Sequence, residues 1–160
     1  MRTRITAAAV AAAIAGLLVP AVASAESDGP GFSPAHRAAA NGGLISVGLT
    51  ADQRLVGFST ARPGDTWSLG KVSGLRGDTV LVGIDFRVQN GKLYGVGEKG
   101  GVYTLSSKAK AMKVSQLTTA LQGRHFGVDF NPAANRLRVI SDTGQNLRHN
   151  IDDPAAPPTT

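Results

Sequence analysis

The sequence repeats itself with a period of 44 residues, and this repeat constrains the fold more than any other feature of the chain. Two consecutive strand-like segments and a following glycine recur in one register, without a gap. The pairs are Val82–Phe86 with Phe126–Phe130, Lys92–Tyr94 with Arg136–Arg138, and Gly100 with Gly144. A match over two successive segments rarely arises by chance, so the chain contains at least two copies of one structural unit.

Short apolar segments alternate with turn-forming residues from Leu44 onwards, which predicts an all-β domain. Their starts lie roughly 8 to 12 residues apart, as in sheets of short strands joined by tight turns. Residues 115–122 are ambiguous, since Leu117 and Leu121 favour a helical turn and a loop is the alternative. The expected strands are residues 44–49, 54–58, 66–72, 80–86, 92–96, 101–105, 112–114, 125–130, 136–140 and 146–149.

A period near 44 residues that holds about four short strands is typical of one blade of a β-propeller. Residues 44–151 are long enough for two to three such blades, whereas closed propellers take about four or more. The sequence therefore predicts β-propeller-like repeats in an incomplete set. The exposed sheet faces and edges of an incomplete set predict self-association.

A resemblance to a known family rests on these same residues. The stretch Gly48–Asp153 carries LVGIDFRVQNGKLYGVG, GGVYTL and FGVDFNPAANRLRVISDTGQNLRHNIDD, and it resembles the secreted bacterial family known as domain of unknown function 4394. The resemblance implies a propeller-like fold and supplies no activity, cofactor or catalytic residue. Members of that family are usually longer, with further repeats after the segment that corresponds to Asn146–Asp153. We therefore expect a truncated or frameshifted member, or one that closes its fold with a second chain.

The first 25 residues have the pattern of a secretory signal peptide. Arg2 and Arg4 precede the apolar segment Ile5–Val19, and Ala23-Ser24-Ala25 provides a small-residue cleavage site. The apolar segment is shorter than the roughly 20 residues that cross a bilayer as a helix. A retained membrane anchor is the alternative. We expect a secreted protein, extracellular or associated with the cell wall, without membrane contact after cleavage.

The remaining boundaries follow from composition. Residues 26–43 contain two prolines and four glycines without an apolar period, which predicts a flexible leader. Residues 44–151 form the expected repeat domain, and residues 152–160 are rich in proline and predict a disordered tail. Because the chain has no cysteine, burial and hydrogen bonding must stabilise it without disulfides.

The net charge of +6 is a weak basis for nucleic-acid binding. It falls by two when the signal peptide is removed, and one tryptophan, two tyrosines and five phenylalanines offer few platforms for base stacking. We therefore expect no nucleic-acid partner. The basic residues are Arg136, Arg138 and Arg148, with Lys108, Lys110 and Lys113 at a distance. Solubility is one interpretation of these charges, and partner binding is the other.

Asp85 and Asp129 are the only metal-ligand candidates, because they occupy equivalent positions in the two repeats. Around a propeller axis such carboxylates can converge on a cation. We expect instead that each carboxylate accepts turn hydrogen bonds inside its own repeat, and the sequence predicts no metal site. In both strands the aspartate alternates with apolar residues, so we expect Val82, Ile84 and Phe86 on one face, and likewise Phe126, Val128 and Phe130.

Other motifs lack the context that their chemistry requires. Residues 95–100 match G-x-G-x-x-G but lead into a predicted strand instead of a helix, which favours a hairpin turn. His36, His125 and His149 lack zinc-ligand spacing. Asp142 and His149 are not accompanied by a G-x-S-x-G nucleophile elbow. The sequence predicts no catalytic residue and no cofactor.

Three hypotheses about function follow. The leading one is a secreted, non-enzymatic propeller-like module that binds an extracellular ligand or protein partner. The alternative is a metal-dependent hydrolase of the lactonase type, in which Asp85 and Asp129 hold a divalent cation together with acids from further blades. The third is a truncated remnant without function.

Overall fold

A computed structural model describes residues 43–153, so the predicted signal peptide, nearly all of the leader and residues 154–160 lie outside the described residues. Within this range the chain is all-β, as predicted, with ten strands and no helix. The strands are β1 (Ile45–Leu49), β2 (Arg54–Ser59), β3 (Arg62–Lys71), β4 (Leu81–Phe86), β5 (Leu93–Gly97), β6 (Gly101–Leu105), β7 (Ala111–Gln116), β8 (Phe126–Asn131), β9 (Arg136–Ser141) and β10 (Asn146–His149).

The ten strands form three antiparallel sheets, each of which follows the chain order. The sheets are β1-β2-β3, β4-β5-β6-β7 and β10-β9-β8. Every strand expected from the sequence is present. The ambiguous residues 115–122 form no helix, because β7 extends to Gln116 and a loop follows. No helix in the described part of the chain is long and apolar enough to cross a membrane.

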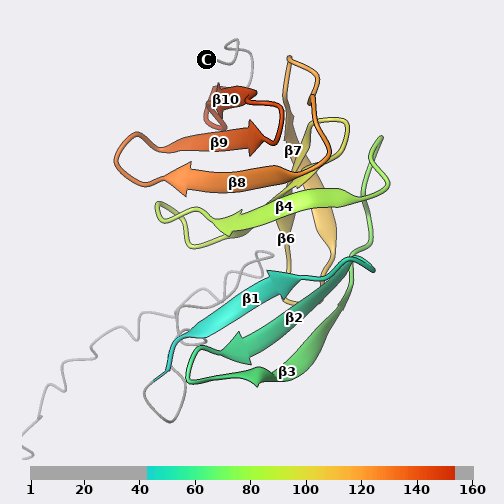
Figure 1. Ribbon diagram of the computed structural model, residues 1–160, viewed down its shortest axis with the longest axis vertical. Coiled ribbons are helices and arrows are strands. Elements are labelled where there is room, and N and C mark those ends of the chain that lie inside the picture. Colours follow the sequence, from blue (N-terminus) through green and yellow to red (C-terminus); the bar gives the residue numbers. More distant parts are fainter. Residues whose placement is uncertain (1–42, 154–160) are drawn as a thin grey trace, which may run out of the picture.

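The first strands of the three sheets lie near one another, with β4 between β8 and β1 (Figure 1). The β4–β7 sheet is therefore the middle one. Its inner strands β5 and β6 are buried along their whole length, which requires cover on both faces. None of the sheets closes on itself.

Two apolar clusters lie on either side of the middle sheet. The burial of each leucine-sized side chain in them stabilises the fold by roughly 1.5–3 kcal/mol. The cluster toward β1–β3 contains Leu55, Leu81, Leu93, Tyr103, Leu105, Ala109 and Ala111. The cluster toward β8–β10 contains Tyr94, Val96, Val102, Leu117, Phe130, Leu137, Val139 and Leu147.

The expected apolar face of β4 is correct for two of its three residues. Ile84 and Phe86 pack against the cluster toward β1–β3, whereas Val82 packs against the cluster toward β8–β10. The register between β4 and β5 shifts between Leu81 and Gly83, and this irregularity places Val82 on the opposite face. In β8, whose pairing with β9 is regular, Phe126, Val128 and Phe130 pack on one side, as predicted.

Candidate functional site

Asp85 joins two sheets. Its carboxylate Oδ2 accepts a hydrogen bond of 2.6 Å from the backbone N–H of Phe130, which lies in β8. This donor lies in the neighbouring sheet, whereas the sequence interpretation expected donors inside the same repeat; the backbone N–H of Phe86, in the same strand, is a second, local donor. Burial raises the pKa of Asp85 above its usual value, and the negative charge of Asp129 adds to this effect.

Asp129 lies at the equivalent position in β8, but its surroundings differ. The side chain is exposed, and its carboxylate makes no hydrogen bond with another described residue. The apolar residues of β8 face the middle sheet, so Asp129 lies on the outer face of the strand and Asp85 contacts it from the other side. No three His, Asp or Glu residues within 43–153 are grouped to hold a metal ion.

The outer face of the β8–β10 sheet is basic. Asp129, Arg138 and Arg148 are direct cross-strand neighbours on β8, β9 and β10. Neither arginine forms an ion pair with a described residue. Arg136 and Ile140 lie on the same face of β9, on either side of Arg138, and Ile140 is 48% exposed. Like charges in direct cross-strand contact destabilise a sheet, so this pair of arginines has a cost for folding.

The lysines noted in the sequence lie on a different sheet. Lys108 and Lys110 belong to the connection between β6 and β7, and Lys113 lies within β7. All three are exposed. The structure therefore separates the basic residues into two surfaces, one on the β8–β10 sheet and one at the edge of the middle sheet.

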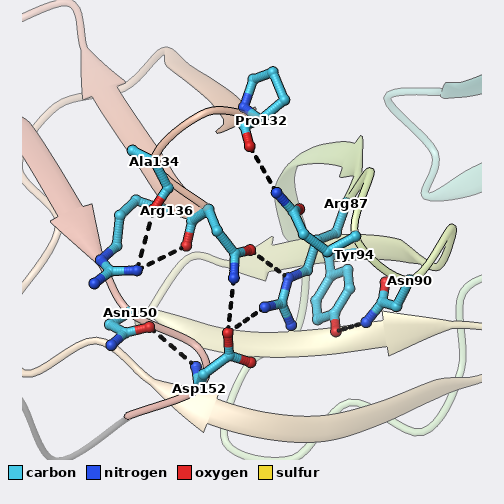
Figure 2. A network of polar contacts seen from close by, with 10 residues as sticks. Arg87, Asn90, Tyr94, Pro132, Ala134, Arg136, Asn150 and Asp152 are labelled. Carbon is cyan, nitrogen blue, oxygen red and sulfur yellow. Dashed lines mark hydrogen bonds and ion pairs between the residues drawn. The ribbon is translucent and has the colours of Figure 1, made fainter.

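A buried arginine connects the turns of the second and third sheets (Figure 2). Arg87, which is 7% exposed, donates from Nε to Oδ1 of Asn135 at 2.9 Å and from Nη2 to Oδ2 of Asp152. Asn135 Nδ2 donates to the same carboxylate oxygen at 2.8 Å. The hydrogen bond from Arg87 holds the pKa of Asp152 below its usual value. Asp152, which the sequence assigns to the tail, thus contributes to the contact between the sheets.

A serine and a histidine form a second buried contact between the same sheets. Oγ of Ser115 in β7 lies 2.6 Å from Nε2 of His149 in β10, and both side chains are buried. His149 Nδ1 has no hydrogen-bond partner among the described residues. Burial lowers the pKa of His149. Folding therefore favours the neutral imidazole over the charged form.

The structure does not bring Asp142 to this pair. Oδ1 of Asp142 accepts a hydrogen bond of 2.9 Å from the backbone N–H of Arg124, and its side chain is exposed. His125 is also exposed, and His36 lies outside the described residues. Within residues 43–153, no carboxylate hydrogen-bonds to the Ser115–His149 pair.

The G-x-G-x-x-G motif forms the hairpin between β5 and β6, as predicted. Gly100 N–H donates to the carbonyl of Gly97 at 2.9 Å, which closes the turn. The two strands leave room for Asp78, because a Cβ atom at either Gly97 or Gly101 would overlap its carboxylate. Asp78 accepts hydrogen bonds of 2.6 Å from the Lys99 N–H and from the Tyr103 hydroxyl. The glycines therefore serve the packing of an internal carboxylate.

Sequence reasoning missed two glutamines that join neighbouring sheets. Gln53 binds the backbone of Leu81 twice, since its Oε1 accepts from the N–H at 2.7 Å and its Nε2 donates to the carbonyl at 3.1 Å. Gln89 donates to the carbonyl of Pro132 at 2.7 Å. Both lie in the turn after the first strand of a sheet. Gln53 directly precedes β2, whereas Gln89 lies four residues before β5, so the repeat does not mark the two glutamines as equivalent.

Comparison with known proteins identifies one family. Residues 54–159 match the family described as Domain of unknown function (DUF4394), which covers more than half of the chain. Neither the curated proteins nor the solved structures contain a significant match to this sequence.

Proposed function

The chain belongs to the family described as Domain of unknown function (DUF4394), and from this premise we propose that it is a secreted, propeller-like module that binds a protein partner outside the cell. Binding, not catalysis, is the proposed activity. The binding surface is the outer face of the β8–β10 sheet. The pattern of a signal peptide in residues 1–25 supports secretion.

The arrangement of the sheets supports the propeller-like part of this proposal. Successive sheets stack face to face, with their first strands near one another, as successive blades do. The turns of the second and third sheets also correspond. Gly91 and Asn135 have φ angles of 64° and 50°, and Gly100 and Gly144 have φ angles of 81° and 86°. Each pair is 44 residues apart, which is the period of the sequence.

One observation carries the binding proposal, namely the contrast between the two equivalent aspartates. Asp85 accepts a backbone N–H from the sheet that stacks on its own, whereas Asp129 offers the same acceptor to solvent. The outer face of β8–β10 therefore presents the carboxylate of Asp129, and the equivalent carboxylate in the neighbouring repeat forms a hydrogen bond with the next sheet.

The charges on this face define the partner. In the middle sheet the corresponding positions are the apolar Tyr94 and Val102, which are buried against the third sheet. The residues 44 positions later are Arg138 and Asn146, and Arg148 lies beside Arg138. Free guanidinium groups bind carboxylates through paired hydrogen bonds. The partner is thus a protein surface that offers carboxylates to the arginines and a backbone N–H to Asp129.

A capture experiment with a charge-reversed face tests this proposal. The immobilised chain is incubated with medium and cell-surface extract from the source organism, and bound proteins are identified by mass spectrometry. The variant Arg138→Glu/Arg148→Glu is compared with Lys110→Glu/Lys113→Glu, which changes the net charge equally on another sheet. We expect the same bound protein with the original chain and the lysine variant, and its loss with the arginine variant. Equal capture by all three chains would refute the assignment of this face.

A further inference from the structure

A groove at the edge of the middle sheet is lined by positive charge. It has a volume of about 610 Å³ and is lined by Gly74, Arg76, Ser106, Lys110, Ala111, Met112 and Lys113. Three of these residues are cationic and none is acidic. None of these three cationic residues forms an ion pair with a residue in the described range. Small-molecule sites typically occupy about 300–1,000 Å³, so the groove has the size of a ligand site.

One wall of the groove is fixed by contacts with β7. The backbone of Ser73 pairs with the start of β7, since its N–H donates to Ala109 at 3.1 Å and its carbonyl accepts from Ala111 at 2.7 Å. The next residue is Gly74, and a Cβ atom there would lie 2.7 Å from the carbonyl oxygen of Ala111. Only glycine allows the loop to approach β7 so closely.

Hydrogen bonds hold the cationic residues on both walls of the groove. The buried hydroxyl of Tyr103 accepts from the Arg76 N–H at 3.1 Å and lies 2.7 Å from the Arg76 carbonyl oxygen, which fixes the backbone of this arginine. Lys113 Nζ donates to the same carbonyl at 3.3 Å. On the other wall, Ser106 Oγ accepts from the Lys110 N–H at 3.1 Å. These contacts fix the backbone of Arg76 and Lys110 and hold the ammonium group of Lys113, so the cationic residues keep their places along the groove before a ligand binds, which lowers the entropic cost of binding.

We propose that this groove binds a small polyanion that carries two or more phosphate or carboxylate groups. Three cations without acidic partners attract negative charge, and the guanidinium of Arg76 suits an oxyanion with two accepting oxygens. A groove of this volume holds an oligomer larger than a single inorganic ion. The exposed Met112 side chain provides an apolar contact for the body of the ligand. This site lies on a different sheet from the face proposed for protein binding.

Calorimetric titration of the purified chain tests the proposal with two probes. Tripolyphosphate represents a phosphate oligomer, and trigalacturonate represents a carboxylate oligomer. The groove variant is Lys110→Gln/Lys113→Gln. Its matched control is Lys99→Gln/Arg124→Gln, which removes the same charge at exposed positions that neither line the groove nor belong to the strands of the β8–β10 face. The far-ultraviolet circular dichroism of each variant verifies its fold, and all four residues are exposed.

We expect at least one probe to bind the original chain, and the probe that binds more tightly identifies the preferred group. The groove variant should lose about tenfold or more in affinity, as two charge-assisted contacts imply, and the control should change by less than about twofold. Binding of neither probe would overturn the proposal. An equal loss in both variants would also overturn it, since the binding would then depend on net charge alone.

Discussion

Asp85 and Phe130 form a direct polar link between the second and third sheets, since the carboxylate of the first accepts the backbone N–H of the second at 2.6 Å. Phe130 is 3% exposed, so water cannot replace this acceptor. The equivalent carboxylate of Asp129 is exposed and makes no such contact. Two residues at the same place in the repeat therefore contribute differently to stability.

Replacement of the two aspartates should reveal this difference. We expect Asp85→Ala to lower the free energy of unfolding by about 1–3 kcal/mol, because a buried N–H loses its acceptor. Asp129→Ala should change it by less than about 0.5 kcal/mol, as at other exposed positions. Urea denaturation measures both values. Asp85→Asn retains an acceptor oxygen and should cost less than Asp85→Ala. Similar losses for Asp85→Ala and Asp129→Ala would contradict this account.

His149 should make the stability of the fold depend on pH. Burial lowers its pKa below the usual 6.5, so the unfolded chain binds a proton before the folded chain does. This contribution to stability is complete above pH 6.5 and is lost as the pH falls through that value toward the folded-state pKa. We expect the urea midpoint to decrease as the pH is lowered from about 8 to about 5, the range in which histidine titrates.

Two substitutions assign this pH dependence. His149→Gln keeps a hydrogen-bonding group near Ser115 but cannot titrate, so the decrease should become smaller. His125→Gln removes an exposed histidine and serves as the matched control. A decrease that persists in His149→Gln, or disappears in His125→Gln, would assign the effect to another group.

The strands were predictable because local patterns determine them. The alternation of apolar residues with glycine and aspartate in residues 82–86 and 126–130 marks strands whatever surrounds them. Val82 departs from this pattern because its face depends on an irregular register with β5. Such a shift arises from the pairing of two strands and leaves no signal in one strand alone.

The contacts between sheets were less predictable than the strands. Ser115 and His149 are 34 residues apart, and only the stacking of two sheets brings them together. The basic groove likewise combines Arg76 with Lys110 and Lys113, which belong to separate elements. The 44-residue repeat indicated which residues are equivalent. It did not indicate which equivalent residue is covered by a neighbouring sheet.

The charged start and apolar segment of the sequence predict export and cleavage after Ala25. N-terminal sequencing of protein recovered from the medium should therefore begin at Glu26, followed by Ser27 and Asp28. Ala23→Lys/Ala25→Lys replaces the small residues that the signal peptidase recognises, so this variant should remain uncleaved. Recovery of the original chain only in membranes, with Met1 present, would instead indicate a retained anchor.

Tyr103 should resist ionisation until the pH is very high. Its burial and its hydrogen bond with Asp78 raise its pKa to about 12. The unfolded chain ionises this group near pH 10, so its contribution to stability is present below about pH 10 and is lost as the pH rises toward 12.

In a Tyr94→Phe background Tyr103 is the remaining tyrosine, and its ultraviolet absorbance reports the ionisation directly. Tyr103→Phe should remove the change in absorbance and should lower the free energy of unfolding by about 1–3 kcal/mol, since Asp78 loses a buried donor. Ionisation of Tyr103 near pH 10 in the folded protein would show that the hydroxyl is not held between Asp78 and Arg76.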